Sequence, residues 1–210
     1  MIKKQYLDIG RNFQIGRYVI LGEEPVSLEE PLKIGENAKI RSHTVIYRGS
    51  KIGNNFQTGH GVLIREGNII GNNVSIGSHS VVECENSIGN NVRIHSQCFI
   101  PEYIKIEDNC WIGPGVTIVN TLHPPCPNFK SCAKGVIIRE GAKIGGNVTI
   151  GPKVIIGKEA LIGFGSVVIS DVPNKVVVAG NPARIIKNVS ELTCRMNFFE
   201  RPYVWEENLG

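Results

Sequence analysis

The feature that most constrains the fold of this chain is an aliphatic residue that recurs every six positions. From Ile34 to Ile118 fifteen positions fall in one frame, and all are isoleucine except Thr58 and Val82. The residue four places after each of them is usually small or apolar, and turn-forming sequences such as Gly53-Asn54-Asn55 stand between them. A period of six fits neither an α-helix nor a single strand, so the pattern indicates a solenoid of short structural repeats.

A coil of short strands joined by tight turns satisfies this period. Because strand side chains alternate between two faces, the residue four places after one isoleucine and the next isoleucine both point inward, and turn residues follow. Gly and Asn suit the turns because they adopt positive φ at little steric cost. Three hexads close a triangular coil, and successive coils stack as parallel strands about 4.8 Å apart.

With this pattern the chain resembles the hexapeptide-repeat acyltransferases, whose fold is a left-handed parallel β-helix. The resemblance covers nearly all of residues 9–187. It implies an all-β chain with a left-handed parallel β-helix of about eight coils over residues 1–187, followed by a C-terminal helix and tail over 188–210. We expect the short helix at Ser190–Phe199 with Ser190 as its N-cap, and an aromatic tail lying against the stack.

The six-residue frame also locates the irregular parts of the chain. Ile9, Ile15 and Leu21 keep the step and predict a first coil, whereas Glu23–Pro31 is out of frame and predicts a small bulge. A second break separates Ile118 from Ile138, and the residues between them include three prolines. We therefore expect a loop over 121–135 that leaves the stack and returns; such insertions in repeat proteins are often functional.

Composition narrows the class of partner. The chain has 23 Lys and Arg against 19 Asp and Glu, a net charge of +4, without a basic cluster that would suggest nucleic acid. The excess suits anionic small molecules such as coenzyme A or a nucleotide sugar. No apolar run approaches a membrane span and no signal peptide is recognised, so we expect a cytoplasmic protein without a membrane partner. Its cysteines are then expected to be reduced, with Cys98 and Cys110 in the core.

Residues eighteen apart stack on one corner of such a coil, and two corners carry chemistry. One corner gathers four histidines, and our candidates for substrate binding there are His60 and His95. Another corner is charged and contains Glu66 and Glu102, and it ends at Asn120, where the loop begins. Since the family assembles as homotrimers, we expect the histidine corner of one subunit to face the charged corner and loop of the next. Alternatively, these histidines are ordinary polar turn residues.

The start of the loop carries the candidate catalytic residues. His123, followed by Pro124, resembles the His-Pro loop of galactoside and maltose acetyltransferases, where the histidine is the general base. The run from Gly113-Pro114 to Asn120 resembles nucleotide-sugar amine N-acetyltransferases, where that asparagine contacts the sugar near its amine. Acetyl transfer from a thioester needs a deprotonated nucleophile and a donor for the developing oxyanion. The alternatives are His60 of a neighbouring subunit as the base, and no protein base at all, with the substrate amine itself sufficing.

The resemblance also implies where acetyl-CoA binds, along the C-terminal coils. The candidates there are Gly145, Gly163 and Ser166 for its amides, and Arg184 and Lys187 for its phosphates. Arg184 ends Gly180-Asn181-Pro182-Ala183-Arg184, which resembles the element that closes the helix near the coenzyme entry in this family. A structural zinc on Cys126, Cys132, Cys194 and His123 is an alternative use of the loop, and it would preclude His123 as a base.

These features favour an acetyl-CoA-dependent N-acetyltransferase acting on the amine of a nucleotide-linked amino sugar, in polysaccharide or glycan biosynthesis. The alternatives are an O-acetyltransferase of the galactoside, maltose or xenobiotic type, and a non-catalytic trimeric scaffold. A γ-class carbonic anhydrase of the same fold is disfavoured, because Gly59-His60 is followed by Arg65 where that enzyme class has a second histidine.

Overall fold

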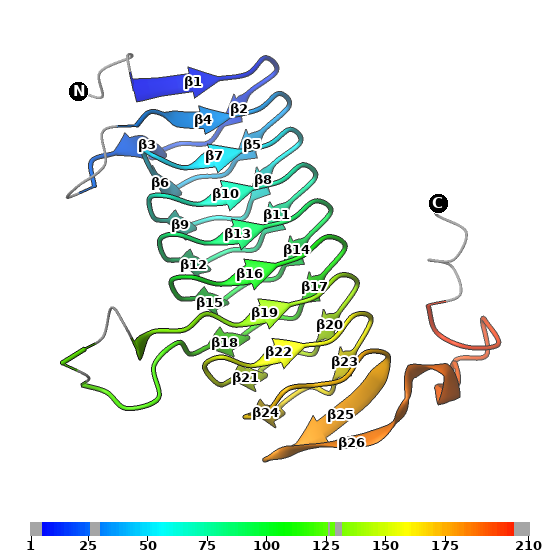
Figure 1. The fold of residues 1–210 in the computed structure, drawn as a ribbon. Coiled ribbons are helices and arrows are strands. Elements are labelled where there is room, and N and C mark those ends of the chain that lie inside the picture. Colours follow the sequence, from blue (N-terminus) through cyan, green and yellow to red (C-terminus); the bar gives the residue numbers. More distant parts are fainter. Residues whose placement is uncertain (1–5, 26–29, 126, 129–131, 204–210) are drawn as a thin grey trace.

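The computed structural model describes residues 6–25, 30–125, 127–128 and 132–203, and it is a stack of triangular coils made of short strands (Figure 1). Three sheets form the sides of the stack, and all their strand pairs are parallel except the last. This confirms the left-handed parallel β-helix, which completes eight coils and ends in a hairpin.

The strands of each sheet follow one another at every third element. Sheet A contains β1 (Leu7–Ile9), β4 (Leu32–Ile34), β7 (Lys51–Ile52), β10 (Ile69–Ile70), β13 (Ser87–Ile88), β16 (Lys105–Ile106), β19 (Ile137–Ile138) and β22 (Ile155–Ile156). Sheet B contains β2 (Gln14–Ile15), β5 (Lys39–Ile40), β8 (Gln57–Thr58), β11 (Ser75–Ile76), β14 (Arg93–Ile94), β17 (Trp111–Ile112), β20 (Lys143–Ile144), β23 (Leu161–Ile162), β25 (Val176–Gly180) and β26 (Ala183–Asn188). Sheet C contains β3 (Ile20–Glu23), β6 (Val45–Tyr47), β9 (Leu63–Ile64), β12 (Val81–Val82), β15 (Phe99–Ile100), β18 (Thr117–Ile118), β21 (Thr149–Ile150) and β24 (Val167–Val168).

Three corners join these sheets, and we number them by chain order. The first corner joins sheet A to sheet B, the second joins sheet B to sheet C, and the third joins sheet C to the next strand of sheet A. Coils are numbered one to eight from the N-terminus. The histidine corner of the sequence is the second corner, and the charged corner is the third.

The core is the aliphatic column that the six-residue period predicted. Each two-residue strand from β5 to β24 has an outward first residue and a buried second residue, as in Lys105–Ile106 and Arg93–Ile94. Cys98 and Cys110 are buried in this column, as expected. Thr58 breaks the isoleucine series without leaving an unpaired group, because its hydroxyl accepts a hydrogen bond from the Arg41 amide at 3.0 Å.

The irregular segments lie where the frame breaks. The first coil forms as β1, β2 and β3, and Glu24 of the following segment pairs with Arg48 at 2.9 Å. The middle of the expected bulge, residues 26–29, lies outside the described residues. The 121–135 loop leaves the third corner after β18 and re-enters the stack at β19, and it projects from the side of the molecule (Figure 1).

The C-terminal region differs from the expectation. The predicted helix over Ser190–Phe199 is wrong: β26 continues to Asn188, and a single 3₁₀ turn, Val189–Glu191, follows with Asn188 rather than Ser190 as its N-cap. A ten-residue helix is marginal without a packed apolar face, and Met196 and Phe198 are exposed. Of the expected aromatic tail, Tyr203 lies against the stack, with the Lys143 ammonium 4.5 Å from the centre of its ring, and residues 204–210 lie outside the described residues. The division of the chain at residue 187 stays a prediction.

No helix among the described residues is both long enough and apolar enough to cross a lipid bilayer.

Candidate functional site

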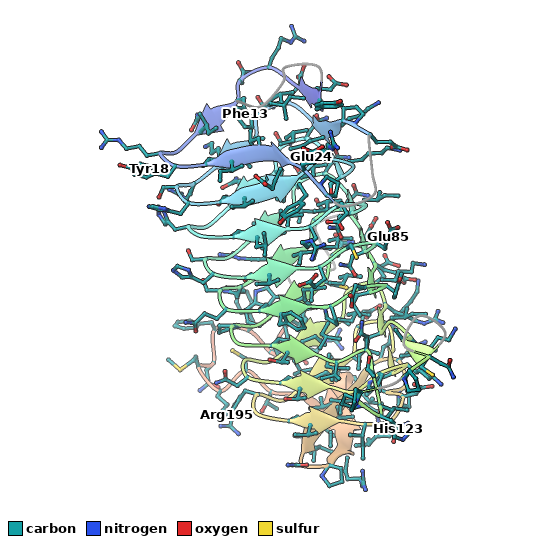
Figure 2. The ribbon with its side chains drawn as sticks, turned by 90° about the vertical axis from the view of Figure 1, so that its left-hand side faces the viewer. Phe13, Tyr18, Glu24, Glu85, His123 and Arg195 are labelled. Atoms are coloured by element: carbon teal, nitrogen blue, oxygen red, sulfur yellow. The ribbon has the colours of Figure 1, made fainter. Side chains whose placement is uncertain are left out.

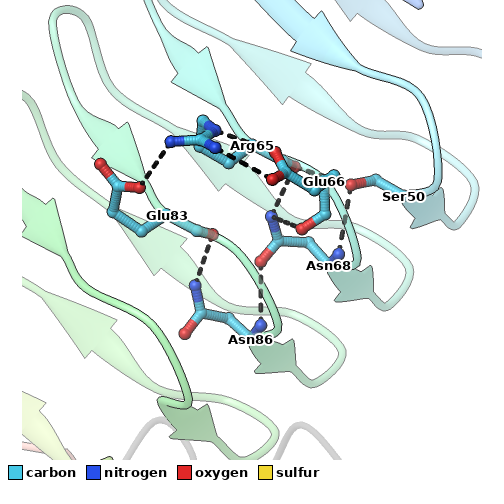
Figure 3. A network of polar contacts seen from close by, with 6 residues as sticks. All are labelled: Ser50, Arg65, Glu66, Asn68, Glu83 and Asn86. Carbon is cyan, nitrogen blue, oxygen red and sulfur yellow. Dashed lines mark hydrogen bonds and ion pairs between the residues drawn. The ribbon is translucent and has the colours of Figure 1, made fainter. Parts of the chain in front are cut away.

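An ionic network occupies the third corner in coils three and four (Figure 3). The Arg65 guanidinium donates two hydrogen bonds of 2.9 Å to the two carboxylate oxygens of Glu66, and a third of 3.3 Å to Glu83. The bond to Glu66 raises the pKa of Arg65. Burial raises the pKa of Glu83, and the nearby Glu102 and Glu66 carboxylates add to this, while Arg65 opposes it. The network therefore holds the bidentate Arg65–Glu66 ion pair beside Glu83, whose raised pKa means that its ionised form is less favourable than that of a free carboxyl group.

A buried ladder of polar side chains supports this corner from inside the stack (Figure 3). The amides of Asn68 and Asn86 each donate 2.7 Å bonds to the carbonyls of Arg65 and Glu83, respectively. Their side-chain oxygens accept bonds from the backbone amides of the next coil, at Asn86 and Ile104. Each coil of the charged corner is thus held in register with the following one.

The same corner continues to Glu102 and Asn120. The Asn120 side-chain amide donates a 2.6 Å bond to the Glu102 carboxylate, and its oxygen accepts a 3.2 Å bond from the Thr121 hydroxyl. The Asn120 carbonyl accepts a bond from the Lys134 amide, which ties the two ends of the loop together. Asn120 is 7% exposed, so its side chain is positioned by protein contacts.

His123 lies three residues further along the loop, and its side chain is exposed. Figure 2 shows His123 and Glu85 on one side of the stack and Tyr18, a second-corner residue, on the opposite side. The predicted zinc set cannot be assembled from the structure, because Cys126 lies outside the described residues. Among the residues that are described, no three His, Cys, Asp or Glu side chains are placed to hold a metal ion.

The histidines of the second corner have different local roles. His43 and His79 occupy the left-handed turn position, with φ of 62° and 59°, and His43 stacks on Tyr18. His60 is exposed, and its Nδ1 lies 2.7 Å from the Ser42 hydroxyl of the preceding coil. The turn therefore explains His43 and His79, whereas His60 presents an imidazole at the surface.

His95 is the least exposed of the four histidines on the second corner. Its ring packs against Trp111 with 4.6 Å between centroids, and its Nε2 is buried with no hydrogen-bond partner among the described residues. Burial lowers the pKa of His95, and the nearby Arg93 lowers it further. The neutral imidazole is accordingly the favoured form near neutral pH.

The second corner becomes glycine-rich toward the C-terminal end. Gly113, Gly145 and Gly163 stack there, and a Cβ at Gly145 would lie 2.5 Å from the Phe164 amide. Glycine is required at Gly113 and Gly145 because the backbone of the following coil occupies the space that a side chain would need. Arg184 pairs with Ala179 in the closing hairpin at the same end of the stack, and it is exposed there. Lys187 pairs with Val177, further from the corner.

Ser166 has a structural position. It is fully buried, its hydroxyl donates a 2.6 Å bond to the Gly163 carbonyl, and it accepts a 3.2 Å bond from the Gly180 amide. These contacts hold the closing hairpin against coil eight, so the Ser166 side chain does not present a free group to a ligand.

Within one chain the predicted site residues fall into two groups. Glu66, Glu102, Asn120 and His123 follow the third corner, whereas His60, His95, Gly145, Gly163 and Arg184 follow the second. The two corners are opposite edges of sheet C, so a single subunit does not bring the groups together. Sequence reasoning missed Arg65, Glu83 and Thr121, although all three lie beside candidate residues on the charged corner and the eighteen-residue register could have found them.

Comparison with known proteins matches parts of this architecture to two models of hexapeptide repeats. The family model described as bacterial transferase hexapeptide (six repeats) matches residues 135–170, and the model described as hexapeptide repeat of succinyl-transferase matches residues 85–119. The structure is similar to that of an Arabidopsis UDP-N-acetylglucosamine acyltransferase, with a TM-score of 0.55 and 20% identity, over 87% of this chain and 70% of that chain. This likeness supports the fold.

Sequence relatives carry the same repeats. The chain is 45% identical over 84 residues to a 2,3,4,5-tetrahydropyridine-2,6-dicarboxylate N-acetyltransferase of Alkaliphilus metalliredigens, which covers 40% of this chain and 33% of the relative. The enzyme of the same name from Brevibacillus brevis is 42% identical, with the same coverage of both chains. The match thus spans about a third of the length of these relatives. Taken with the two family models, it shows that the chain carries transferase-type hexapeptide repeats over residues 85–119 and 135–170.

Proposed function

We propose that this protein is an acetyl-CoA-dependent N-acetyltransferase that acts on the amine of a nucleotide-linked amino sugar. The observation that carries the proposal is the buried Asn120 side chain, oriented by Glu102 and Thr121 where the His123 loop leaves the stack. Asparagine at this place, after Gly113-Pro114, is the feature that resembles the amine N-acetyltransferases. The acetyltransferase names of the sequence relatives support the reaction class.

The proposed active unit is a homotrimer that buries sheet C. The outward positions of sheet C carry no charge in any coil, in contrast to the lysines and Arg93 on sheets A and B. These sheet C positions are Ile20, Val45, Leu63, Val81, Phe99, Thr117, Thr149 and Val167. Apolar area on a flat face favours association, and three such faces can close around a three-fold axis.

This arrangement would complete the site. Because the second and third corners are the two edges of sheet C, closure of three subunits places the second corner of one beside the third corner of the next. His60, His95 and the glycine column of one subunit then face Glu66, Glu102, Asn120 and His123 of its neighbour. Residues of the two groups at the same coil level lie at the same height along the cleft.

In the proposed reaction the acceptor amine attacks the thioester carbonyl of acetyl-CoA. The new C–N bond forms as the C–S bond breaks, the amine loses a proton and coenzyme A leaves as the thiol. Asn120 positions the acceptor near its amine, and His123 takes the proton. The glycine column and Arg184 hold the coenzyme, with Lys187 as a second candidate for its phosphates and Gly145 and Gly163 exposing backbone to its amides.

The relatives favour a second candidate acceptor within the same reaction class. Their name specifies N-acetylation of a dicarboxylate rather than of a sugar, so an amine on a small dicarboxylate is the alternative substrate. An O-acetyltransferase would require His123 as the base, because a hydroxyl is far less nucleophilic than an amine until it is deprotonated.

The test is the release of free thiol from acetyl-CoA in the presence of nucleotide-linked 3-amino and 4-amino sugars, amino dicarboxylates and plain sugars. We expect release with an amine acceptor, and a fall of about 10²–10⁴ in kcat for His123→Ala if His123 is the general base. Leu122→Ala, an exposed neighbour on the same loop, is the control.

Release that survives in His123→Ala would retain the N-acetyltransferase and remove the base role. Turnover with hydroxyl acceptors alone would replace the proposal by the O-acetyltransferase. Lack of release with every acceptor would count against catalysis and favour a trimeric scaffold.

A further inference from the structure

A groove of about 240 Å³ lies on the outer surface of sheet B, beside the second corner. Small residues create it. Residues eighteen apart in the sequence stack in a column along the coils. One column contains Arg41, Gly59, Gly77 and His95 in coils two to five, and in the neighbouring column Ser75 precedes Arg93. The first column therefore has no side chain in coils three and four, whereas the second has a small side chain only in coil four, at Ser75, with Gln57 before it.

Both ends of the groove are cationic. Arg41 in coil two lines one end, and Arg93 in coil five lines the other together with His95. Three coil spacings of about 4.8 Å separate these ends, a backbone distance of roughly 14 Å. The hydroxyl-bearing residues Ser78 and Ser96 line the wall between them, and no carboxylate is among the lining residues of the part of the chain that the structure describes.

The two guanidinium groups differ from those of the three arginines that form ion pairs. Arg11, Arg48 and Arg65 each have a glutamate partner within 3.0 Å. Arg41 and Arg93 have no carboxylate partner among the described residues, although they flank the same groove. Cationic side chains that line a groove without a counter-charge can donate their hydrogen bonds to an anionic ligand. Arg in particular binds phosphate and carboxylate in a bidentate manner.

His95 adds a second indication of a ligand. Its buried Nε2 lacks a hydrogen-bond partner among the described residues, a state that native proteins rarely leave uncompensated. A ligand seated at this end of the groove, with a small rotation of the ring away from Trp111, would supply the missing partner.

We propose that this groove binds a dianionic group of the acceptor, a diphosphate or a pair of carboxylates, between Arg41 and Arg93. The inference rests on the proposed acetyl transfer and adds the recognition of the acceptor's charged end. Arg93 and His95 belong to coil five, as does Glu102, and Asn120 belongs to coil six. In the proposed trimer the groove of one subunit thus lies on the N-terminal side of the amine-binding Asn120 of the next, with its Arg93 end level with Glu102.

The two sources of such a group can be separated. A nucleotide-linked amino sugar carries a diphosphate, whereas an amino dicarboxylate carries two carboxylates on a shorter frame. The groove recognises the shared chemistry, negative charge at two points, and the acceptor that is turned over identifies the source.

The first experiment measures binding without catalysis. Inorganic pyrophosphate and glutarate are titrated calorimetrically into the wild-type protein and into Arg41→Gln and Arg93→Gln. Loss of one charge-assisted contact is expected to weaken binding of the preferred anion by about tenfold to a hundredfold. Arg139→Gln, which removes an exposed arginine from the first corner, is the matched control and is expected to bind as the wild type does.

The second experiment measures steady-state kinetics with three acceptors: a nucleotide-linked amino sugar, an amino dicarboxylate and an uncharged amino sugar. Both arginine variants are expected to raise the KM of the charged acceptor about tenfold or more while leaving its kcat and the KM of acetyl-CoA unchanged. The uncharged acceptor is expected to be insensitive to the substitutions.

Unchanged anion binding in both arginine variants overturns the inference, and so does an equal effect of Arg139→Gln. Equal KM values for charged and uncharged acceptors also overturn it. Arginine-dependent binding of pyrophosphate or glutarate in a protein that acetylates none of the amines supports the anion site and, separately, counts against the proposed acetyl transfer.

Discussion

Asn120 shows how single residues are oriented at the start of the loop. Its side-chain nitrogen donates a hydrogen bond to Glu102, and its side-chain oxygen accepts one from the Thr121 hydroxyl. Its backbone carbonyl accepts a hydrogen bond from the Lys134 amide across the loop. Three contacts to three different segments leave the side chain little freedom. Glu102 is therefore assigned a positioning role, which differs from the direct substrate binding that the charged corner predicted for it.

Substitution of Glu102 tests that role. In Glu102→Ala the Asn120 amide loses its acceptor, and we expect kcat to fall by about tenfold to a hundredfold, because small misplacements in an active site are costly. Glu102→Gln retains an acceptor oxygen, so we expect it to restore most of kcat. Steady-state kinetics of both variants, with the exposed Glu85→Gln as control, provide the measurement. An equal loss in Gln and Ala would show instead that the negative charge itself is needed.

Within the elements, the polar ladder of Ser50, Asn68 and Asn86 takes a place in the core that aliphatic residues fill in later coils. Ile104 and Val136 follow it in the same column. The asparagines are fully buried, yet their donors and acceptors are bonded to backbone groups of two coils. The ladder connects the rigid core to the Arg65–Glu66–Glu83 network directly outside it.

Removal of one rung tests this connection. Asn86→Ala leaves the Glu83 carbonyl and the Ile104 amide without their side-chain partner, and each buried group left unpaired costs about 1–3 kcal/mol. We expect a matching fall in the free energy of unfolding from denaturant titration. Asn72→Ala, in the exposed asparagine ladder of the first corner, should cost less than about 1 kcal/mol because water replaces the lost bonds. Similar losses in the two variants would contradict a specific role for the buried ladder.

At the scale of the whole molecule, the three sides of the triangular stack are chemically unequal. Sheets A and B present lysine or arginine side chains to solvent, whereas sheet C presents an uncharged and largely apolar row over eight coils. Phe99 in the middle of this row is 39% exposed in the single chain. The asymmetry favours sheet C as the face of the proposed subunit interface, which has the second and third corners at its edges.

A charge on sheet C should dissociate the assembly. For the wild type we expect a mass by light scattering of three times the 23.0 kDa of one chain. Val81→Lys places an ammonium in the proposed interface, so we expect a shift to the monomer and loss of the acetyl transfer that needs two subunits. Ser87→Lys, on sheet A in the following coil, should leave both unchanged. A wild-type monomer, or an active Val81→Lys monomer, would refute the composite site.

The candidate site could be predicted from the sequence only in part. The register of eighteen grouped Glu66 with Glu102 and Asn120 on one corner, and His60 with His95 on another, because stacking follows from the repeat alone. The bond between Glu102 and Asn120, the buried Nε2 of His95 and the use of the Ser166 hydroxyl in the closing hairpin depend on side-chain rotamers. These rotamers depend on side-chain packing between coils, which the six-residue period does not specify.

The sequence by itself determined the coil. An inward isoleucine every six residues with glycine and asparagine in the turns admits few structures other than a triangular stack, and the breaks at Glu23–Pro31 and 121–135 could be located by counting. Tertiary structure decided the C-terminal region, where only the 3₁₀ turn Val189–Glu191 follows β26 in place of the helix predicted at Ser190–Phe199, because a short helix without a packed apolar face is not stable. Tertiary structure also decided that Arg41 and Arg93 line opposite ends of one groove. The two residues are distant in sequence, and the stacking of small residues between them forms the groove.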